Sequence, residues 1–262
     1  MAGGRMIETL LDAHARDVAR RVIAEESARR EHVVVYLSGA HAYGFPSPDS
    51  DLDLKCIHVA PTRALLGLAP PVPTFDRAEI LDGVEIDYTS NELGHALTGI
   101  LRGNGNFLER VLGSAVLAPS SMLERLREIG ARSLSRRVHR HYRGFAESQL
   151  RELDKRPTVK RLLYVMRTAL TGTHLLETGT LITDLPTLLD AHDQRDAAVL
   201  IERKRAGERT PLEDAERTRW RARVDALFTA LDDALARSPL PEAPQNEAEL
   251  DAFLIEARRA RL

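Results

Sequence analysis

The spacing of apolar and polar residues divides the chain into an N-terminal part with strand and helix patterns and a C-terminal part with helix patterns only. Strands are predicted where apolar residues run together or alternate with polar ones: 33–37, 51–56, 78–81 and 83–89. Helices are predicted from apolar stripes or capping-box spacing: 8–29, 89–101 and 106–112. An Asp82-Gly83 turn would join the last two strands as a hairpin. Residues 1–119 are therefore predicted to form a small mixed α/β domain.

Beyond Pro119 the strand patterns stop and helical periodicity takes over. Helices are predicted in four segments: 121–154, 158–177, 210–237 and 247–261. Thr210-Pro211-Leu212-Glu213 has the order of a cap residue, a first-turn proline and an N3 glutamate, and Gly179 suits a helix C-cap. Residues 120–262 are predicted to form an all-α domain. The expected fold class is thus a mixed-sheet α/β domain followed by an all-α domain.

The composition, 43% hydrophobic and 29% charged over 262 residues, suits one large or two small domains with an adequate core. The single cysteine, Cys56, excludes an internal disulfide and is expected to be a buried structural thiol on a strand. No apolar run approaches membrane-spanning length, and the N-terminus lacks an apolar signal core. We therefore expect a cytoplasmic protein with no membrane partner.

The net charge of −2 conceals an uneven distribution of charge along the chain. Residues 120–175 carry 13 Lys and Arg against 5 Asp and Glu, whereas acidic residues outnumber basic ones on either side. A basic segment of this kind suits a polyphosphate or nucleic acid partner. A solvated helix face would have the same charge pattern, so both interpretations stay open.

A glycine turn and two carboxylates in register form the strongest functional signal. Ser38, Gly39 and Ala40 follow the first predicted strand, and small residues there let backbone N–H groups approach a phosphate closely. Asp51 and Asp53 alternate with apolar residues, which places both carboxylates on one face of the second strand. Such carboxylates repel each other unless a cation lies between them. Mg²⁺ (or Mn²⁺), bound together with substrate phosphates, would remove the repulsion.

A third carboxylate is expected on the last predicted strand. Glu85 and Asp87 share one face of that strand, and Asp87 is predicted to complete a cluster with Asp51 and Asp53. A three-carboxylate cluster can hold two metal ions for phosphoryl transfer. Glu85 is the rival to Asp87, and either residue could instead be an exposed acid on a sheet face.

The glycine turn, the Asp51-Leu52-Asp53 pair and Asp87 resemble the nucleotidyltransferase domain of the DNA polymerase β superfamily. Within that superfamily, three segments are similar to the predicted nucleotidyltransferases of bacterial RNA repair operons: 39–53, 103–106 and 162–167. The chain departs from the family pattern at Ala40, where the family usually has serine. Ser38 or backbone amides would then contact the nucleotide's phosphates.

The resemblance implies a metal-dependent enzyme that transfers a nucleoside monophosphate from a nucleoside triphosphate to a hydroxyl and releases pyrophosphate. Asp51 and Asp53 would bind both metal ions, and Asp87 would bind the one that activates the attacking hydroxyl. Nucleotide contacts are expected from eight residues: Ser38, Gly39, Ala40, His41, Tyr43, Asn104, Lys160 and Arg167. His41 and Tyr43 could instead pack the loop, and Asn104 could instead cap a helix.

The acceptor favoured by the basic segment and by the resemblance is an RNA 3′ end, such as that of a tRNA. Nucleotidyl transfer to a small molecule or to a protein hydroxyl is a second interpretation. A third is an RNA-binding module without catalysis, which Ala40 favours.

Overall fold

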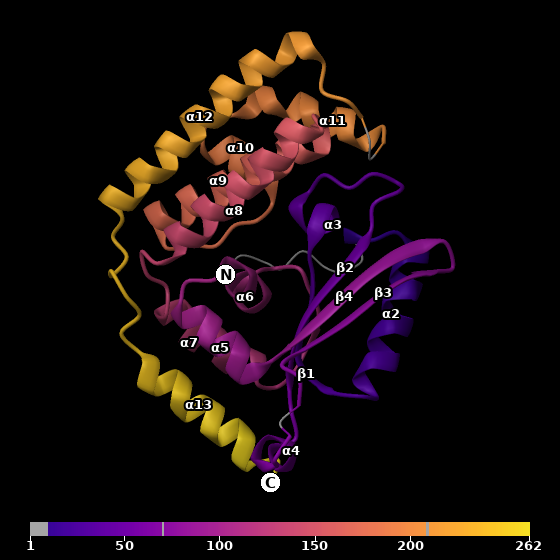
Figure 1. Cartoon of the computed structure of the whole chain (residues 1–262), viewed down its shortest axis with the longest axis vertical. Coiled ribbons are helices and arrows are strands. Elements are labelled where there is room, and N and C mark those ends of the chain that lie inside the picture. Colours follow the sequence, from indigo (N-terminus) through magenta and orange to yellow (C-terminus); the bar gives the residue numbers. More distant parts are fainter. Residues whose placement is uncertain (1–9, 70, 208–209) are drawn as a thin grey trace. The chain divides into compact units, whose positions relative to one another are not determined.

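The computed structural model describes residues 10–69, 71–207 and 210–262 (Figure 1). It contains two compact units. The first comprises Met1–His41, Asp51–Ser133 and Pro244–Leu262, and the second comprises Ala42–Ser50 and Leu134–Ala243. These units differ from the predicted division at residue 119, because a loop near the N-terminus groups with the second unit and the C-terminal segment groups with the first. The assignment of catalysis to one domain and substrate binding to the other stays a prediction.

A five-stranded mixed sheet forms the centre of the first unit. Its strands are β1 (Glu31–Leu37), β2 (Leu52–Val59), β3 (Thr74–Leu81), β4 (Val84–Glu92) and β5 (Val116–Pro119). Their order is β3-β4-β2-β1-β5, with β2 and β4 parallel and the other neighbouring pairs antiparallel. The mixed sheet confirms the predicted fold class for this part of the chain. The edge strand β5 was not among the predicted strands.

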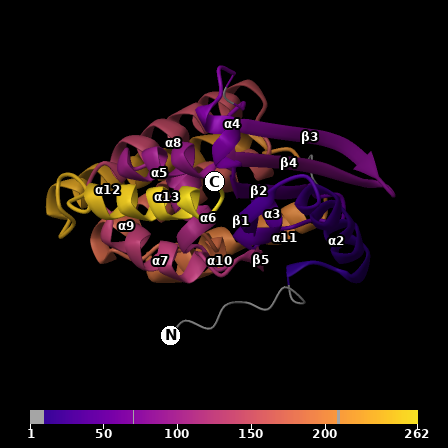
Figure 2. The same cartoon turned by 90° about the horizontal axis from the view of Figure 1, so that it is seen from below.

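The strands form where the sequence pattern places them. Five consecutive residues of β1, 33–37, are buried, and in β2 Leu52, Leu54 and Cys56 alternate with half-exposed polar residues. The Asp82-Gly83 pair forms the predicted two-residue hairpin turn between β3 and β4, and both residues have positive φ. Figure 2 shows this hairpin at the edge of the sheet.

Some helices of the first unit pack directly on the sheet, and others pack on those helices. The helices of this unit are α2 (Ala13–Ser27), α4 (Thr62–Leu66), α5 (Leu93–Leu101), α6 (Gly105–Leu112), α7 (Leu123–Arg132) and α13 (Glu247–Arg259), and the short α3 (Gly39–Tyr43) carries the chain from the first unit to the second. Of the helix predicted over 8–29, residues 8 and 9 lie outside the described residues. The capping box predicted at Thr89 is wrong. Strand β4 continues through Glu92, and the Glu92 carboxylate accepts hydrogen bonds from the first-turn N–H groups of α5.

The C-terminal helix α13 packs against α5 and α7 in the first unit (Figure 1). Asn246, just before α13, accepts a hydrogen bond from the hydroxyl of Ser133 at 3.0 Å and donates one to the carbonyl of Ile129 at 3.1 Å. Arg125 pairs with Glu256 at 2.8 Å. These contacts explain why the end of the chain groups with the sheet rather than with the helices that precede it.

The second unit is helical and is built around one long buried helix. Its helices are α8 (Val138–Lys155), α9 (Val159–Thr178), α10 (Leu185–Ala191), a 3₁₀ turn at Arg195–Ala197, α11 (Ala198–Arg205) and α12 (Asp214–Arg237). Helix α9 packs against α8, α10, α11 and α12 and ends at the predicted C-cap, Gly179. The predicted cap at Thr210 is wrong: its hydroxyl donates to the carbonyls of Arg203 and Gly207, and α12 starts only after Glu213. Among the described residues, no helix is long and apolar enough to cross a membrane.

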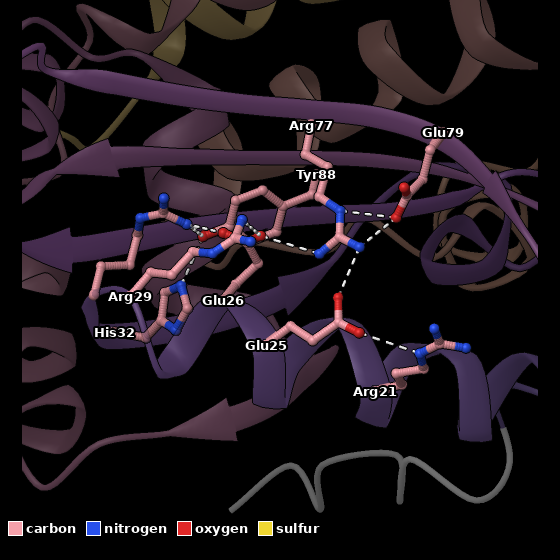
Figure 3. Close-up of polar contacts among 9 residues, drawn as sticks. Arg21, Glu25, Glu26, Arg29, His32, Arg77, Glu79 and Tyr88 are labelled. Carbon is pink, nitrogen blue, oxygen red and sulfur yellow. Dashed lines mark hydrogen bonds and ion pairs between the residues drawn. The ribbon is translucent and has the colours of Figure 1, made fainter.

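A buried carboxylate ties α2 to the sheet of the first unit (Figure 3). Glu26 is 2% exposed, and it accepts hydrogen bonds from Arg29 and Arg77 at 3.0 Å and from Arg30. Arg30 also donates to the hydroxyl of Tyr88 at 2.9 Å. Burial alone would raise the pKa of Glu26, but the hydrogen bonds from Arg30 and Arg77 and the charges of Arg30 and Arg29 outweigh burial and hold that pKa below its ordinary value of 4.5. The carboxylate is therefore ionised in the folded protein.

We predict that Glu26→Gln lowers the free energy of unfolding by about 2 kcal/mol near neutral pH, because hydrogen bonds to a charged group are lost. A lowered pKa in the folded state stabilises the protein above the unfolded pKa, and this contribution is lost as the pH falls through the folded pKa. The difference between wild type and E26Q should therefore shrink on acidification below about pH 4. Urea denaturation followed by circular dichroism at several pH values measures it.

Glu25→Gln is the matched control, because Glu25 is the next residue of α2 and also pairs with Arg77, but is 38% exposed. Exposed ion pairs contribute little to stability. A loss in E25Q as large as that in E26Q would contradict the role given to the buried carboxylate.

Candidate active site

Two predicted carboxylates face each other across the parallel strands β2 and β4. In the ladder, Asp53 is the direct partner of Asp87. Asp53 is 23% exposed and Asp87 54%, whereas their neighbours Leu54 and Tyr88 are buried on the other side of the strands. Asp51 precedes β2 by one residue and is half-exposed, in step with the same alternation. The backbone thus brings acidic residues to one face of the sheet.

The rival acid, Glu85, lies on the same face of β4 as Asp87 and is also exposed. It precedes the first residue pair of the β2–β4 ladder, which joins Leu52 to Ile86. Asp87, by contrast, is opposite a carboxylate within the ladder. Register therefore favours Asp87 over Glu85 as the partner of Asp53.

A lysine that the sequence interpretation missed lies beside these acids. The Lys55 Nζ is 2.7 Å from the Asp87 Oδ1 and 3.9 Å from the Asp53 Oδ1, and it is 3.4 Å from the hydroxyl of Thr89. Its ammonium group supplies the positive charge that two neighbouring carboxylates require. Lys55 follows Asp53 by two residues on β2, so the same period-two pattern that located the acids could have located it.

The glycine turn lies against Asp53. The backbone N–H of Ser38 donates to the Asp53 carbonyl at 2.9 Å, and Gly39 has a φ of +66°. A Cβ at position 39 would lie 1.9 Å from the Asp53 Oδ2, so no other residue fits there without moving that carboxylate. Ala40 is buried, so a methyl group rather than a hydroxyl packs at this point, and His41 is half-buried.

Other predicted nucleotide contacts lie in the helical unit. The guanidinium of Arg167 lies 3.9 Å from the ring centroid of Tyr43, and both side chains are buried. The Tyr164 ring meets Tyr43 edge-on, and Lys160 Nζ is 6.0 Å from the Tyr164 centroid. The structure therefore brings Tyr43, Lys160 and Arg167 together around one aromatic cluster. Contact of these residues with a nucleotide stays a prediction.

Asn104, in the first unit, caps helix α6. Its side-chain oxygen accepts a hydrogen bond from the backbone N–H of Asn106 at 3.0 Å. Helix capping is one of the two roles that the sequence allows for Asn104, the other being nucleotide binding. A direct contact between Asn104 and a nucleotide stays a prediction.

A buried lysine, also missed, holds the loop that leads to Asp51. Lys204 on α11 is fully buried, and its Nζ donates to the hydroxyls of Ser47 at 2.5 Å and Ser50 at 3.3 Å. Ser47 in turn donates to the carboxylate of Asp49 at 2.7 Å. Nothing in the local sequence distinguishes Lys204 from a surface lysine, since its role depends on a contact more than 150 residues away in the chain.

Cys56, on β2, is buried, as predicted. Burial raises the pKa of its thiol to about 12, so the thiolate needed for nucleophilic chemistry does not form at neutral pH. This agrees with the expected structural role of the thiol.

The oxygen ligands on this face of the sheet are of the kind that a hard divalent cation prefers. Asp51, Asp53 and Asp87 offer carboxylate oxygens, which Mg²⁺ prefers, and the ammonium of Lys55 shows that positive charge is accommodated beside two of them. Within the described parts of the chain, no three His, Cys, Asp or Glu side chains are already arranged to coordinate a metal. A bound ion would therefore need side-chain rotation or oxygens supplied by a substrate.

A glycine turn followed by acidic residues on a mixed sheet is the pattern of polymerase β-like nucleotidyltransferases. The chain belongs to the RNA repair pathway DNA polymerase beta family (RlaP), whose family model matches residues 15–256. The predicted resemblance to that group is thereby confirmed. Membership supports an enzyme of the nucleotidyltransferase class.

Two known proteins are similar to the chain. The uncharacterized protein MJ0002 of Methanocaldococcus jannaschii is 27% identical over 227 residues, which cover 84% of this chain and 91% of that protein. The crystal structure of a nucleotidyltransferase-like protein from Exiguobacterium sibiricum aligns over 94% of this chain and 80% of the other, with 14% identity and a TM-score of 0.33.

We predict that Gly39→Ala destabilises the protein more than Gly83→Ala does. Both glycines have positive φ, so both substitutions incur the backbone cost of about 1 kcal/mol. A Cβ at Gly83 meets nothing within 4 Å, whereas one at Gly39 collides with Asp53. The collision should lower the free energy of unfolding by about 1–3 kcal/mol more in G39A, measured by urea denaturation. Equal losses in the two variants would contradict the close approach of the turn to Asp53.

Proposed function

We propose that this protein transfers a nucleoside monophosphate from a nucleoside triphosphate to the 3′-hydroxyl of an RNA, releasing pyrophosphate. The observation that carries the proposal is the direct pairing of Asp53 with Asp87 across parallel strands, beside the turn at Gly39. Family membership supports the class of reaction. The link of this family to an RNA repair pathway and the basic residues of the helical unit support the acceptor.

Asp51, Asp53 and Asp87 would hold divalent cations, Mg²⁺ or Mn²⁺. When bound, these ions would neutralise the phosphates and lower the pKa of the attacking hydroxyl. Asp51 and Asp53 would bind both metal ions, and Asp87 would bind the one that activates the attacking hydroxyl. Asp87, the most exposed of the paired acids, would accept the proton of the attacking hydroxyl.

In the proposed reaction, the acceptor oxygen forms a bond to the α-phosphorus while the bond from that phosphorus to the β-phosphate oxygen breaks. The Ser38 N–H is bonded to the Asp53 carbonyl, so the backbone N–H groups of Gly39 and Ala40 would face the leaving β- and γ-phosphates. Because Ala40 has no hydroxyl, backbone amides would supply those donors. Lys55 offsets the repulsion between Asp53 and Asp87, and its flexible stem lets it turn toward a phosphate as substrate enters.

We predict that Asp53→Asn and Asp87→Asn each lower nucleotidyl transfer at least about 100-fold, because each removes a carboxylate ligand from a site that depends on metal charge. Glu85→Gln is the matched control, since it removes an exposed charge from the same face of β4 as Asp87 and should leave transfer unchanged. The assay uses end-labelled RNA with each nucleoside triphosphate in Mg²⁺ or Mn²⁺, and follows both RNA length and pyrophosphate.

The outcomes separate the open interpretations. Extension of RNA by wild type and E85Q but not by D53N or D87N supports the proposal. If pyrophosphate were released without RNA extension, and only when a small molecule or protein is added, the acceptor would be that molecule and not RNA. RNA binding without pyrophosphate release from any acceptor would identify a module without catalysis. Full activity in D53N would refute the assigned site.

A further inference from the structure

The helical unit contains a pocket that shares Lys160 with the predicted nucleotide contacts, but most of its lining has no role in the assignments above. Its volume is about 770 Å³, within the range of small-molecule sites. It is lined by residues of α8, of the segment before α9 and of the first turns of α9. The side chains that matter below are Phe145, Gln149, Arg156, Lys160, Arg161 and Tyr164.

Two aromatic rings line this pocket. Phe145 is 36% exposed on α8, so the hydrophobic core does not account for its position. The Tyr164 ring is fixed by edge-on contacts with Tyr43 and Phe45, at interplanar angles of 83° and 81°. A ring that is exposed and a ring that is held rigidly are both suited to stack on a nucleobase.

A polar side chain lies in the same pocket with its orientation fixed. The side-chain oxygen of Gln149 accepts a hydrogen bond from the hydroxyl of Thr168 at 2.8 Å. That bond directs the amino group of Gln149 away from Thr168, as an N–H donor. A donor beside aromatic faces suits a carbonyl oxygen or ring nitrogen of a base.

Three cations line the pocket: Arg156, Lys160 and Arg161. Glu152 also lines it, but its carboxylate binds the ammonium of Lys155 at 2.6 Å, so its charge is offset. The first turn of α9 adds the positive end of a long helix. Positive charge beside stacking surfaces is what a phosphate-linked base requires.

We infer that this pocket binds an unpaired nucleotide of the RNA acceptor, with its base against Phe145 and Tyr164 and its phosphates against Arg156, Lys160 and Arg161. The inference rests on the proposed function for the identity of the ligand as acceptor RNA. The volume lies in the upper part of the range for small-molecule sites. Cations spread over two segments suit successive phosphates of a strand.

The test measures binding alone. A short single-stranded RNA, labelled at its 5′ end and ending in a 3′-deoxynucleotide, is titrated with the full chain in the presence of a chelator, so that no transfer occurs. Fluorescence anisotropy gives the Kd. Phe145→Ala should weaken RNA binding about tenfold, and Phe145→Trp should restore it, because the larger ring can stack again. Binding of ATP alone is measured in parallel with each variant.

Two controls are exposed helical residues that do not line the pocket. Val199→Ala removes an exposed apolar side chain from α11 and should leave RNA binding unchanged. Arg161→Ala should reduce the dependence of log Kd on log salt concentration by about 0.7, the slope of one phosphate contact on a single strand. Arg237→Ala removes an exposed arginine of α12 and should not change that slope.

Equal RNA affinity of wild type and F145A, with F145A folded by circular dichroism, would overturn the inference. So would an F145A protein that loses affinity for ATP but not for RNA, because the pocket would then hold the incoming nucleotide. If F145A lost affinity for duplex RNA as strongly as for single-stranded RNA, the inference that the pocket binds an unpaired base would be overturned. Since the assay needs neither metal nor a reactive 3′ end, its result is independent of whether D53N abolishes transfer.

Discussion

The parallel pairing of β2 with β4 is the constraint on which the candidate site depends. In this register Leu54 and Tyr88 are buried together while Asp53 and Asp87 are brought opposite each other on the other face. A slip by one residue would expose the apolar pair and bury the acids, so the core that stabilises the sheet also fixes the carboxylates. The cost of holding two like charges together is offset by Lys55 on the same face. Folding and site geometry therefore share one determinant.

The elements that follow from local pattern could be predicted from the sequence. The run of buried residues in β1, the alternation in β2 and the Asp82-Gly83 hairpin depend only on periodicity and turn chemistry. The start of α5 could not be placed in this way, because β4 continues to Glu92 through pairing with both neighbouring strands. The four-residue strand β5 is likewise defined by its partner, β1, rather than by its own pattern.

The candidate site likewise contains residues that can be predicted from the sequence and residues that cannot. Asp51, Asp53, Asp87 and the turn at Gly39 carry a signal in sequence because their spacing determines the face on which they lie. Lys204 carries no such signal, because its hydroxyl partners are distant in the chain. The number of charges in the basic segment, residues 120–175, does not reveal how many of them are available to a partner. Several of its arginines are engaged within the protein: Arg136 with main-chain carbonyls, Arg143 with Glu147 and Asp232, and Arg132 with Glu249.

The membership of residues 42–50 in the helical unit has a consequence for modularity. Phe45 is fully buried and its ring contacts Tyr164, and Gly44 leaves no space for a side chain beside Asp184 and Pro186. Residues 42–50, which lie between β1 and β2 in the sequence, thus complete the hydrophobic core of the helical unit. Neither unit is a contiguous stretch of chain, so neither can be exchanged for a homologous piece by a single crossover in the gene. The two units are therefore expected to be inherited together, and to change together, over evolutionary time.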